Sequence, residues 1–188
     1  VTDAAGTYVF SSLLAGNYLL RVEPDTIGAS VYDNCLATYY GGTYLWDSAM
    51  IYQHYCDSNI TQANIVMIEV VPTVGPGSIS GVVYEGAGFG QKLMQGPGNP
   101  VINTNVVPGV PVKVGKNPSG TIVATGITNT SGAYYFNNLP YDNYRIYTDI
   151  PGYPMDSSYV VTLSAGNDGL VNLDYYVDSN SVYIDITT

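Results

Sequence analysis

Few residues in this chain are suited to chemistry, and they do not fall into a catalytic pattern. There is one histidine, His54, and there are two cysteines, Cys35 and Cys56. A catalytic site needs a nucleophile beside a base and an orienting group, or metal ligands at a suitable spacing. The cysteines form no CxxC pair, and the carboxylates are scattered over turn-like stretches. We therefore predict that the protein is not an enzyme, that it holds no cofactor, and that His54 is a surface or packing residue.

Aromatic residues are the second chemically notable group. The chain has 19 tyrosines and 3 phenylalanines. Several stand close to Trp46, between the two cysteines. Flat aromatic faces stack on sugar rings, so part of this cluster is a candidate ligand platform. The same side chains also suit a plug that caps the open end of a β-sandwich, and both interpretations stay open. The platform residues are Trp46, Tyr39, Tyr40 and Tyr44.

Charge and composition narrow the class of protein. The net charge is −10, which opposes binding to nucleic acid or to an anionic membrane surface. No apolar run approaches the ~20 residues that a membrane-spanning helix needs. Hydrophobic residues make up 46 % of the chain, enough for a packed core. High Gly and Pro content without helical apolar stripes indicates an all-β fold.

An internal repeat organises the chain. Residues 2–20 (TDAAGTYVFSSLLAGNYLL) and 128–147 (TNTSGAYYFNNLPYDNYRIY) align without a gap at an offset of 126 positions. Each copy reads as a turn, a strand, a second turn and a returning strand. A glycine permits a positive φ at the first turn, and aromatic residues then alternate with a period of two. We expect Leu139 to plug the second turn.

The repeat motif, T-D-x-x-G-x-Y-x-F-x-x-L-x-x-G-x-Y, resembles the B-type modules of bacterial surface proteins. Those include the serine-aspartate-repeat and collagen-adhesin B domains and the carboxypeptidase-regulatory-like modules. Residues 38–49 (TYYGGTYLWDSA) and 147–158 (YTDIPGYPMDSS) are similar to stretches of secreted Bacteroidota surface proteins, including gliding adhesins. The resemblance implies small β-sandwiches of immunoglobulin or transthyretin type, which serve as spacers, binders or appendages.

We predict two tandem modules joined by a linker. Residues 1–71 form a partial first module, residues 72–77 a Pro/Gly linker, and residues 78–188 a complete second module. The second copy of the motif is preceded by strands that have no counterpart before the first copy. Either the chain begins further upstream, or another polypeptide supplies the missing strands by donation between subunits.

The expected strands follow the apolar alternation. In the first module, residues 63–71 should form a closing strand with Val66, Ile68 and Val70 on one face. In the second module, a long Gly/Pro/Asn loop follows the first strand, and Val171, Leu173, Tyr175 and Val177 should all point inward. The second-module strands are expected at 78–84, 110–116, 121–127, 133–137, 143–149, 158–163, 170–177 and 181–186.

The resemblance to extracellular modules implies covalent features. In an extracellular acidic β-protein, Cys35 and Cys56 should form a disulfide that closes the loop holding Trp46; two buried free thiols are the alternative. Some related modules contain a Lys–Asn amide cross-link, but Lys113 lies between inward-facing valines and should face out, so we do not expect one here.

Two further features come from the same resemblance. Related modules bind calcium through turn aspartates, and Asp3 occupies the motif position, although solvated turn carboxylates explain it equally well. Asp-Ser/Thr dipeptides resemble the O-glycosylation signal of the Bacteroidota, with ordinary turn chemistry as the alternative. The candidate glycosylation residues are Thr26, Ser48, Ser58, Ser157 and Ser179.

These observations favour a structural or adhesive part of a secreted, extracellular cell-surface protein that contacts neighbouring modules or subunits. A C-terminal sorting domain of the type IX secretion system follows such modules in similar proteins. Two other functions stay open. One is a polymerising filament subunit completed by a neighbour's strand, and the other is a carbohydrate-binding appendage of a secreted enzyme that contacts surface glycans.

Overall fold

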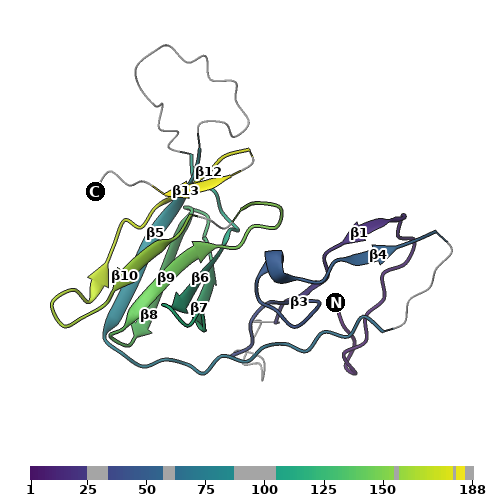
Figure 1. Cartoon of the computed structure of the whole chain (residues 1–188), viewed down its shortest axis with the longest axis horizontal. Coiled ribbons are helices and arrows are strands. Elements are labelled where there is room, and N and C mark those ends of the chain that lie inside the picture. Colours follow the sequence, from purple (N-terminus) through teal and green to yellow (C-terminus); the bar gives the residue numbers. More distant parts are fainter. Residues whose placement is uncertain (25–33, 57–61, 87–104, 155–156, 180, 185–188) are drawn as a thin grey trace, which may run out of the picture.

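Figure 1 shows a computed structural model of the chain, which describes residues 1–24, 34–56, 62–86, 105–154, 157–179 and 181–184. Within these ranges the regular structure is strand, apart from one 3-10 turn, η1 (Trp46–Ser48). The predicted all-β fold is confirmed. In the described residues, no helix is long and apolar enough to cross a membrane.

The described residues from Gly77 onward form a sandwich of two sheets, which we call the second unit (Figure 1). One sheet has the order β10-β9-β6-β7. Its strands are β6 (Pro111–Lys116), β7 (Ile122–Ile127), β9 (Asn143–Thr148) and β10 (Tyr159–Thr162). The other has the order β11-β5-β12-β13, with β8 paired to the opposite edge of β5. Its strands are β5 (Gly77–Glu85), β8 (Ala133–Leu139), β11 (Gly169–Leu170), β12 (Tyr175–Val177) and β13 (Val182–Ile184).

The core lies between these sheets and follows the predicted alternation closely. Val112 and Val114 on β6 are fully buried, as are Tyr144 and Ile146 on β9. Leu139 is also fully buried at the end of β8, where the sequence placed a plug. Burying such side chains contributes roughly 1.5–3 kcal/mol each, so this alternation accounts for most of the sandwich's stability.

The predicted strand over residues 170–177 is interrupted. Asn172 adopts a left-handed backbone conformation, φ +62°, which separates β11 from β12. Val171 therefore points outward and is 63 % exposed, against expectation, while Tyr175 and Val177 are buried as expected. A left-handed residue shifts the side-chain alternation, and asparagine tolerates that conformation better than most residues.

The described residues before position 72, which we call the first unit, form less regular structure. It carries two short antiparallel pairs, β1 with β4 and β2 with β3, and no two-sheet sandwich forms among its described residues. The bounds are β1 (Gly16–Tyr18), β2 (Arg21–Val22), β3 (Thr38–Tyr39) and β4 (Tyr52–His54). The predicted closing strand over 63–71 is wrong as regular structure. It has only an isolated bridge, Cys35 with Glu69, and Val66 is 81 % exposed.

Gly81 is a position in β5 where a side chain has no room. A Cβ there would lie 2.2 Å from the Leu173 carbonyl oxygen and 2.7 Å from the Tyr134 hydroxyl. The tyrosine side chain passes across the strand at this glycine and donates a hydrogen bond to that carbonyl at 2.5 Å. The glycine is therefore required by the side chain that crosses it.

Gly81→Ala should destabilise the sandwich by about 1–3 kcal/mol, because the methyl group displaces either the Leu173 backbone or Tyr134. Urea unfolding of the variant and of the parent chain measures this. Gly166→Ala is the matched control, since a Cβ there meets no atom within 4 Å. Equal stabilities for the two variants would contradict the assignment.

Candidate functional site

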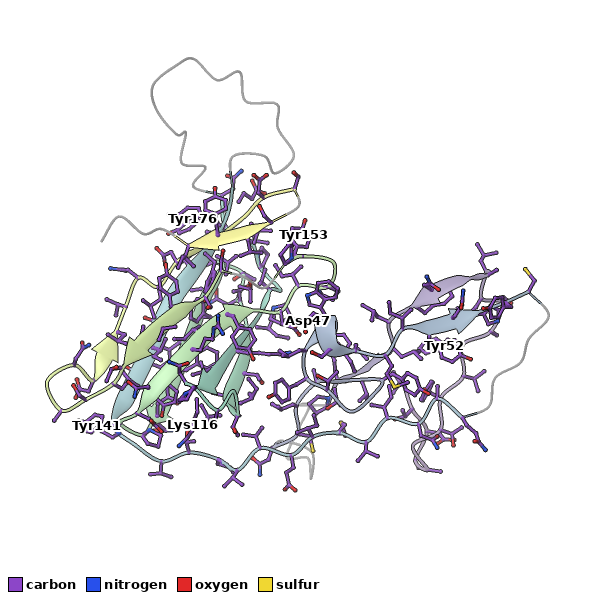
Figure 2. All side chains as sticks on the ribbon, viewed as in Figure 1. Asp47, Tyr52, Lys116, Tyr141, Tyr153 and Tyr176 are labelled. Carbon is purple, nitrogen blue, oxygen red and sulfur yellow. The ribbon has the colours of Figure 1, made fainter. Side chains whose placement is uncertain are left out.

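The two units meet where the loop around η1 lies against the four-stranded sheet. Figure 2 shows Asp47 of the first unit close to Tyr153 of the second at this junction. The contact residues come from β3 and η1 on one side and from β6, β9 and the turn after β9 on the other. We call this contact the joint.

A buried ion pair lies at the centre of the joint. Lys113 lies on β6 between two inward-facing valines and so faces out, as the alternation predicts. It is nevertheless only 4 % exposed, because the first unit covers it. Its Nζ lies 2.5 Å from Oδ2 of Asp149, which is 1 % exposed, and also donates to the carbonyl of Tyr44. Its outward orientation is as predicted, but the first unit and not water lies against it.

The first unit also donates a hydrogen bond to the Asp149 carboxylate. The backbone N–H of Trp46 donates to Oδ1 of Asp149 at 3.1 Å. The Trp46 indole N–H donates to the carbonyl of Tyr153 at 3.1 Å, and the Tyr44 hydroxyl donates to the carbonyl of Gly120 at 3.0 Å. Both oxygens of Asp149 are thus satisfied, which is the condition under which a buried charge is tolerated.

The residues of the predicted platform are used within this joint. Tyr39 is 1 % exposed, and its ring centre lies 5.9 Å from Lys113 Nζ and 5.7 Å from Arg21 Cζ. Tyr40 is half-buried and packs edge-on against Tyr52. Tyr39 therefore covers cations, Tyr44 and Trp46 bond to the second unit, and Tyr40 packs within the first unit. Glycan stacking on these residues stays a prediction.

Burial sets the electrostatics of the joint. Loss of solvent lowers the pKa of the Lys113 ammonium, and the hydrogen bond and charge of Asp149 partly offset this. Tyr147 lies beside Lys113 in the β6–β9 register. Its pKa is raised above the ordinary value, first by desolvation and then by the neighbouring Tyr44 and Asp149. The raised pKa keeps the Tyr147 hydroxyl protonated at neutral pH.

A cleft of about 480 Å³ opens beside the joint. Arg21 and Glu23, which form an ion pair, line one wall, and apolar residues of the second unit line the rest. A nucleophile with an adjacent base is absent from this lining. His54 lies elsewhere, with Nδ1 3.2 Å from the Leu14 carbonyl oxygen and its ring edge-on to Tyr18.

The predicted disulfide is wrong, because Cys35 and Cys56 are both free thiols. They are held by different backbone pairings. Cys35 bridges Glu69, whereas Cys56 follows β4, which pairs with β1. Cys35 is half-buried and Cys56 is exposed, so the alternative of two buried thiols also fails for Cys56. The joint, and not a disulfide, fixes the loop that holds Trp46.

The remaining candidate residues are dispersed. Ser48 and Ser179 are exposed and Ser157 is half-buried, while Thr26 and Ser58 lie outside the described residues. Glycosylation at these positions stays a prediction.

The candidate calcium ligand Asp3 accepts hydrogen bonds through Oδ1 from the amides of Ala5 and Thr7. It therefore shapes its own turn. Over the part of the chain that the structure describes, no cluster of His, Cys, Asp or Glu forms a metal site.

Comparisons with known proteins give distant similarities. No family model matches the chain. Colossin-A of Dictyostelium discoideum is 29 % identical over 161 residues, which is 84 % of this chain and 1 % of that protein. The chain therefore spans a very small part of this relative.

Three solved structures show weak likeness. A variant of BcpA, the major pilin subunit of Bacillus cereus, has TM-score 0.39 and 18 % identity, over 62 % of this chain and 32 % of that one. The Bacillus anthracis TIE protein has TM-score 0.37 and 18 % identity, over 95 % and 27 %. The group B streptococcus pilus 2b backbone protein has TM-score 0.34 and 14 % identity, over 85 % and 52 %.

Only part of the joint could be predicted from the amino-acid sequence. Lysine and arginine number 5 in the chain, so a lysine flanked by valines in a core strand was already unusual. An aspartate follows directly after the neighbouring strand β9. What periodicity could not reveal is that a third element, from the first unit, covers the outer face at this point.

Asp149→Ala should destabilise the chain by about 3–5 kcal/mol, because it leaves the Lys113 charge buried without a counterion. Denaturant unfolding measures the loss. Asp142→Ala is the matched control, since its ion pair with Lys116 (2.8 Å) is partly exposed and should contribute no more than about 1 kcal/mol. A small effect at both positions would show that the pair does not support the fold.

Tyr147 should ionise later than a free tyrosine during alkaline titration, because desolvation raises its pKa. The difference in phenolate absorbance between the parent chain and Tyr147→Phe isolates this group. Below pH 10 both the folded and unfolded forms keep the proton, so the residue adds no pH dependence there. Above it only the unfolded state releases the proton, so stability should fall as the pH rises. Ionisation of Tyr147 at the ordinary tyrosine pKa would contradict a covered joint.

Proposed function

We propose that this chain is a structural part of a secreted cell-surface protein, in which two β units act together as a rigid spacer. The observation that carries the proposal is the joint. A short linker alone would leave two units free to pivot. Here the first unit buries the Lys113–Asp149 pair of the second unit, and hydrogen bonds from Trp46 and Tyr44 join the two units side by side.

The chemistry of the rest of the chain supports a mechanical role. Neither the cleft nor the joint presents a nucleophile with an adjacent base, and the buried charges are paired with each other. The repeat and its resemblance to B-type surface modules support an extracellular stalk, adhesin or filament component. In such a protein the spacer holds distant parts at a fixed separation, and its stiffness is the property on which selection acts.

A distance measurement across the joint tests the rigid spacer. Spin labels at Ile51→Cys in the first unit and Val160→Cys in the second, both exposed positions, should give a single narrow distance distribution by electron double resonance. The native cysteines Cys35 and Cys56 are replaced by serine beforehand so that only the introduced thiols are labelled.

Adding Trp46→Ala should broaden that distribution, because it removes the indole hydrogen bond to Tyr153 across the joint. Tyr135→Ala is the matched control, since this aromatic residue is exposed on β8 and should leave the distribution unchanged. A broad distribution in the parent chain would overturn the proposal.

A further inference from the structure

The two copies of the repeat have the same local structure, down to individual hydrogen bonds. Oδ1 of Asp3 accepts hydrogen bonds from the amides two and four residues further on, at 2.9 and 2.8 Å. Oδ1 of Asn129, its counterpart, does the same at 2.9 and 3.1 Å. The neutral asparagine replaces the aspartate without changing the turn, because one acceptor oxygen is all that the turn uses.

The backbone of the two copies also agrees at its unusual positions. Gly6 and Gly132 have φ of +77° and +67° at the first turn. Ser12 and Asn138 have φ of +60° and +56° at the second. Non-glycine residues adopt this conformation seldom, so the agreement shows that residues 7–13 are shaped as β8 is.

What differs between the copies is how much of each is covered. Tyr8 and Phe10 have ring centres 5.6 Å apart, and Tyr134 and Phe136 have ring centres 5.8 Å apart, with similar tilt. Yet Phe10 is 61 % exposed, whereas Phe136 is 6 % exposed. The same arrangement of two rings therefore lies in the core of the second unit and at the surface of the first.

Strand β5 provides the cover in the second unit. It lies between β8 on one side and β11 and β12 on the other, with Ile79 opposite Phe136 and Gly81 opposite Tyr134. The Tyr134 side chain spans this central strand at its glycine and donates to the Leu173 carbonyl on the far side.

The first unit has both flanks of this arrangement. The Tyr8 hydroxyl donates to the carbonyl of Ala63, as Tyr134 does to Leu173. β12 begins two residues after Leu173, so the segment that begins two residues after Ala63, residues 65–67, takes the place of β12. Among the described residues no strand or bridge pairs with residues 7–13.

We propose that the first unit is an acceptor for one β-strand of a separate polypeptide, inserted antiparallel to residues 7–13 and parallel to residues 65–67. The incoming strand has the pattern apolar-x-Gly-x-apolar. The first apolar residue covers Phe10, the glycine leaves room for Tyr8, and the second apolar residue lies opposite Ile65. Strand addition of this kind gains backbone hydrogen bonds and specific side-chain pockets together.

The described part of this chain has such a pattern in β5, and that strand is already committed. Ile79 and Val83 are fully buried in its own sandwich. Moving β5 into the first unit would expose as much of the core of the second unit as it covers in the first, with no net gain in buried surface. The inserted strand is therefore not β5 of the same chain. This inference does not depend on the rigid-spacer function, since the acceptor lies away from the joint.

The test uses a synthetic peptide with the β5 sequence, GSISGVVYEG, added to the full 188-residue chain. Hydrogen exchange followed by mass spectrometry should show new protection of residues 7–13. A peptide carrying Gly81→Ala should bind about tenfold more weakly or worse, because its methyl group meets the Tyr8 hydroxyl and the Ala63 carbonyl, as it would meet Tyr134 and Leu173 in the second unit.

A protein variant provides the second arm. Phe10→Ser should weaken peptide binding without unfolding the chain, because Phe10 is exposed in the absence of the strand. Val160→Ser, equally exposed on β10, is the matched control and should bind as the parent does.

Three results would overturn the proposal. They are no protection of residues 7–13 at saturating peptide, equal binding of the alanine peptide, and protection confined to the second unit. Protection of residues 7–13 in the natural full-length protein before any peptide is added would also overturn it, since the slot would then be filled by the same polypeptide.

Discussion

The arrangement of this molecule depends on one buried ion pair, Lys113 with Asp149. Removing two charges from water costs several kcal/mol each, and that cost is offset only when every donor and acceptor of the pair is satisfied. The second unit by itself supplies one bond between the two side chains. The remaining partners, the Tyr44 carbonyl, the Trp46 amide and the Tyr39 hydroxyl, come from the first unit. Burial of the pair and docking of the units are therefore one event.

This coupling explains why the loop around Trp46 is so rich in tyrosine. A tyrosine ring can lie against a cation while its hydroxyl reaches a polar group, which suits an interface containing charge. Tyr39 contacts both Arg21 and Lys113, and the Tyr44 hydroxyl reaches the second unit. A phenylalanine at position 44 would keep the ring and lose the hydrogen bond to the second unit.

The repeat separates two levels of organisation. Turn hydrogen bonds to the side chain of Asp3 or Asn129, positive-φ residues and the pairing of neighbouring aromatic rings are encoded within about twenty residues, and they form in both copies. Burial of those rings is not encoded there, because it requires a neighbouring strand, which among the described residues pairs with the second copy and not with the first. Phe10 and Phe136 thus have the same local surroundings and opposite exposure.

Sequence by itself determined the all-β class, the repeat and its turns, and the inward-facing residues of the second unit, such as Val112, Leu139 and Ile146. These follow from periodicity and from turn chemistry, which act over a few neighbouring residues. Tertiary structure alone decided that Lys113 is buried, that Cys35 and Cys56 stay apart, and that Val171 points out. Each of these depends on which distant segment covers a face or on one residue that shifts the register. Alternation identifies the two faces of a strand, but only the folded chain shows whether water or another element lies against the outer one.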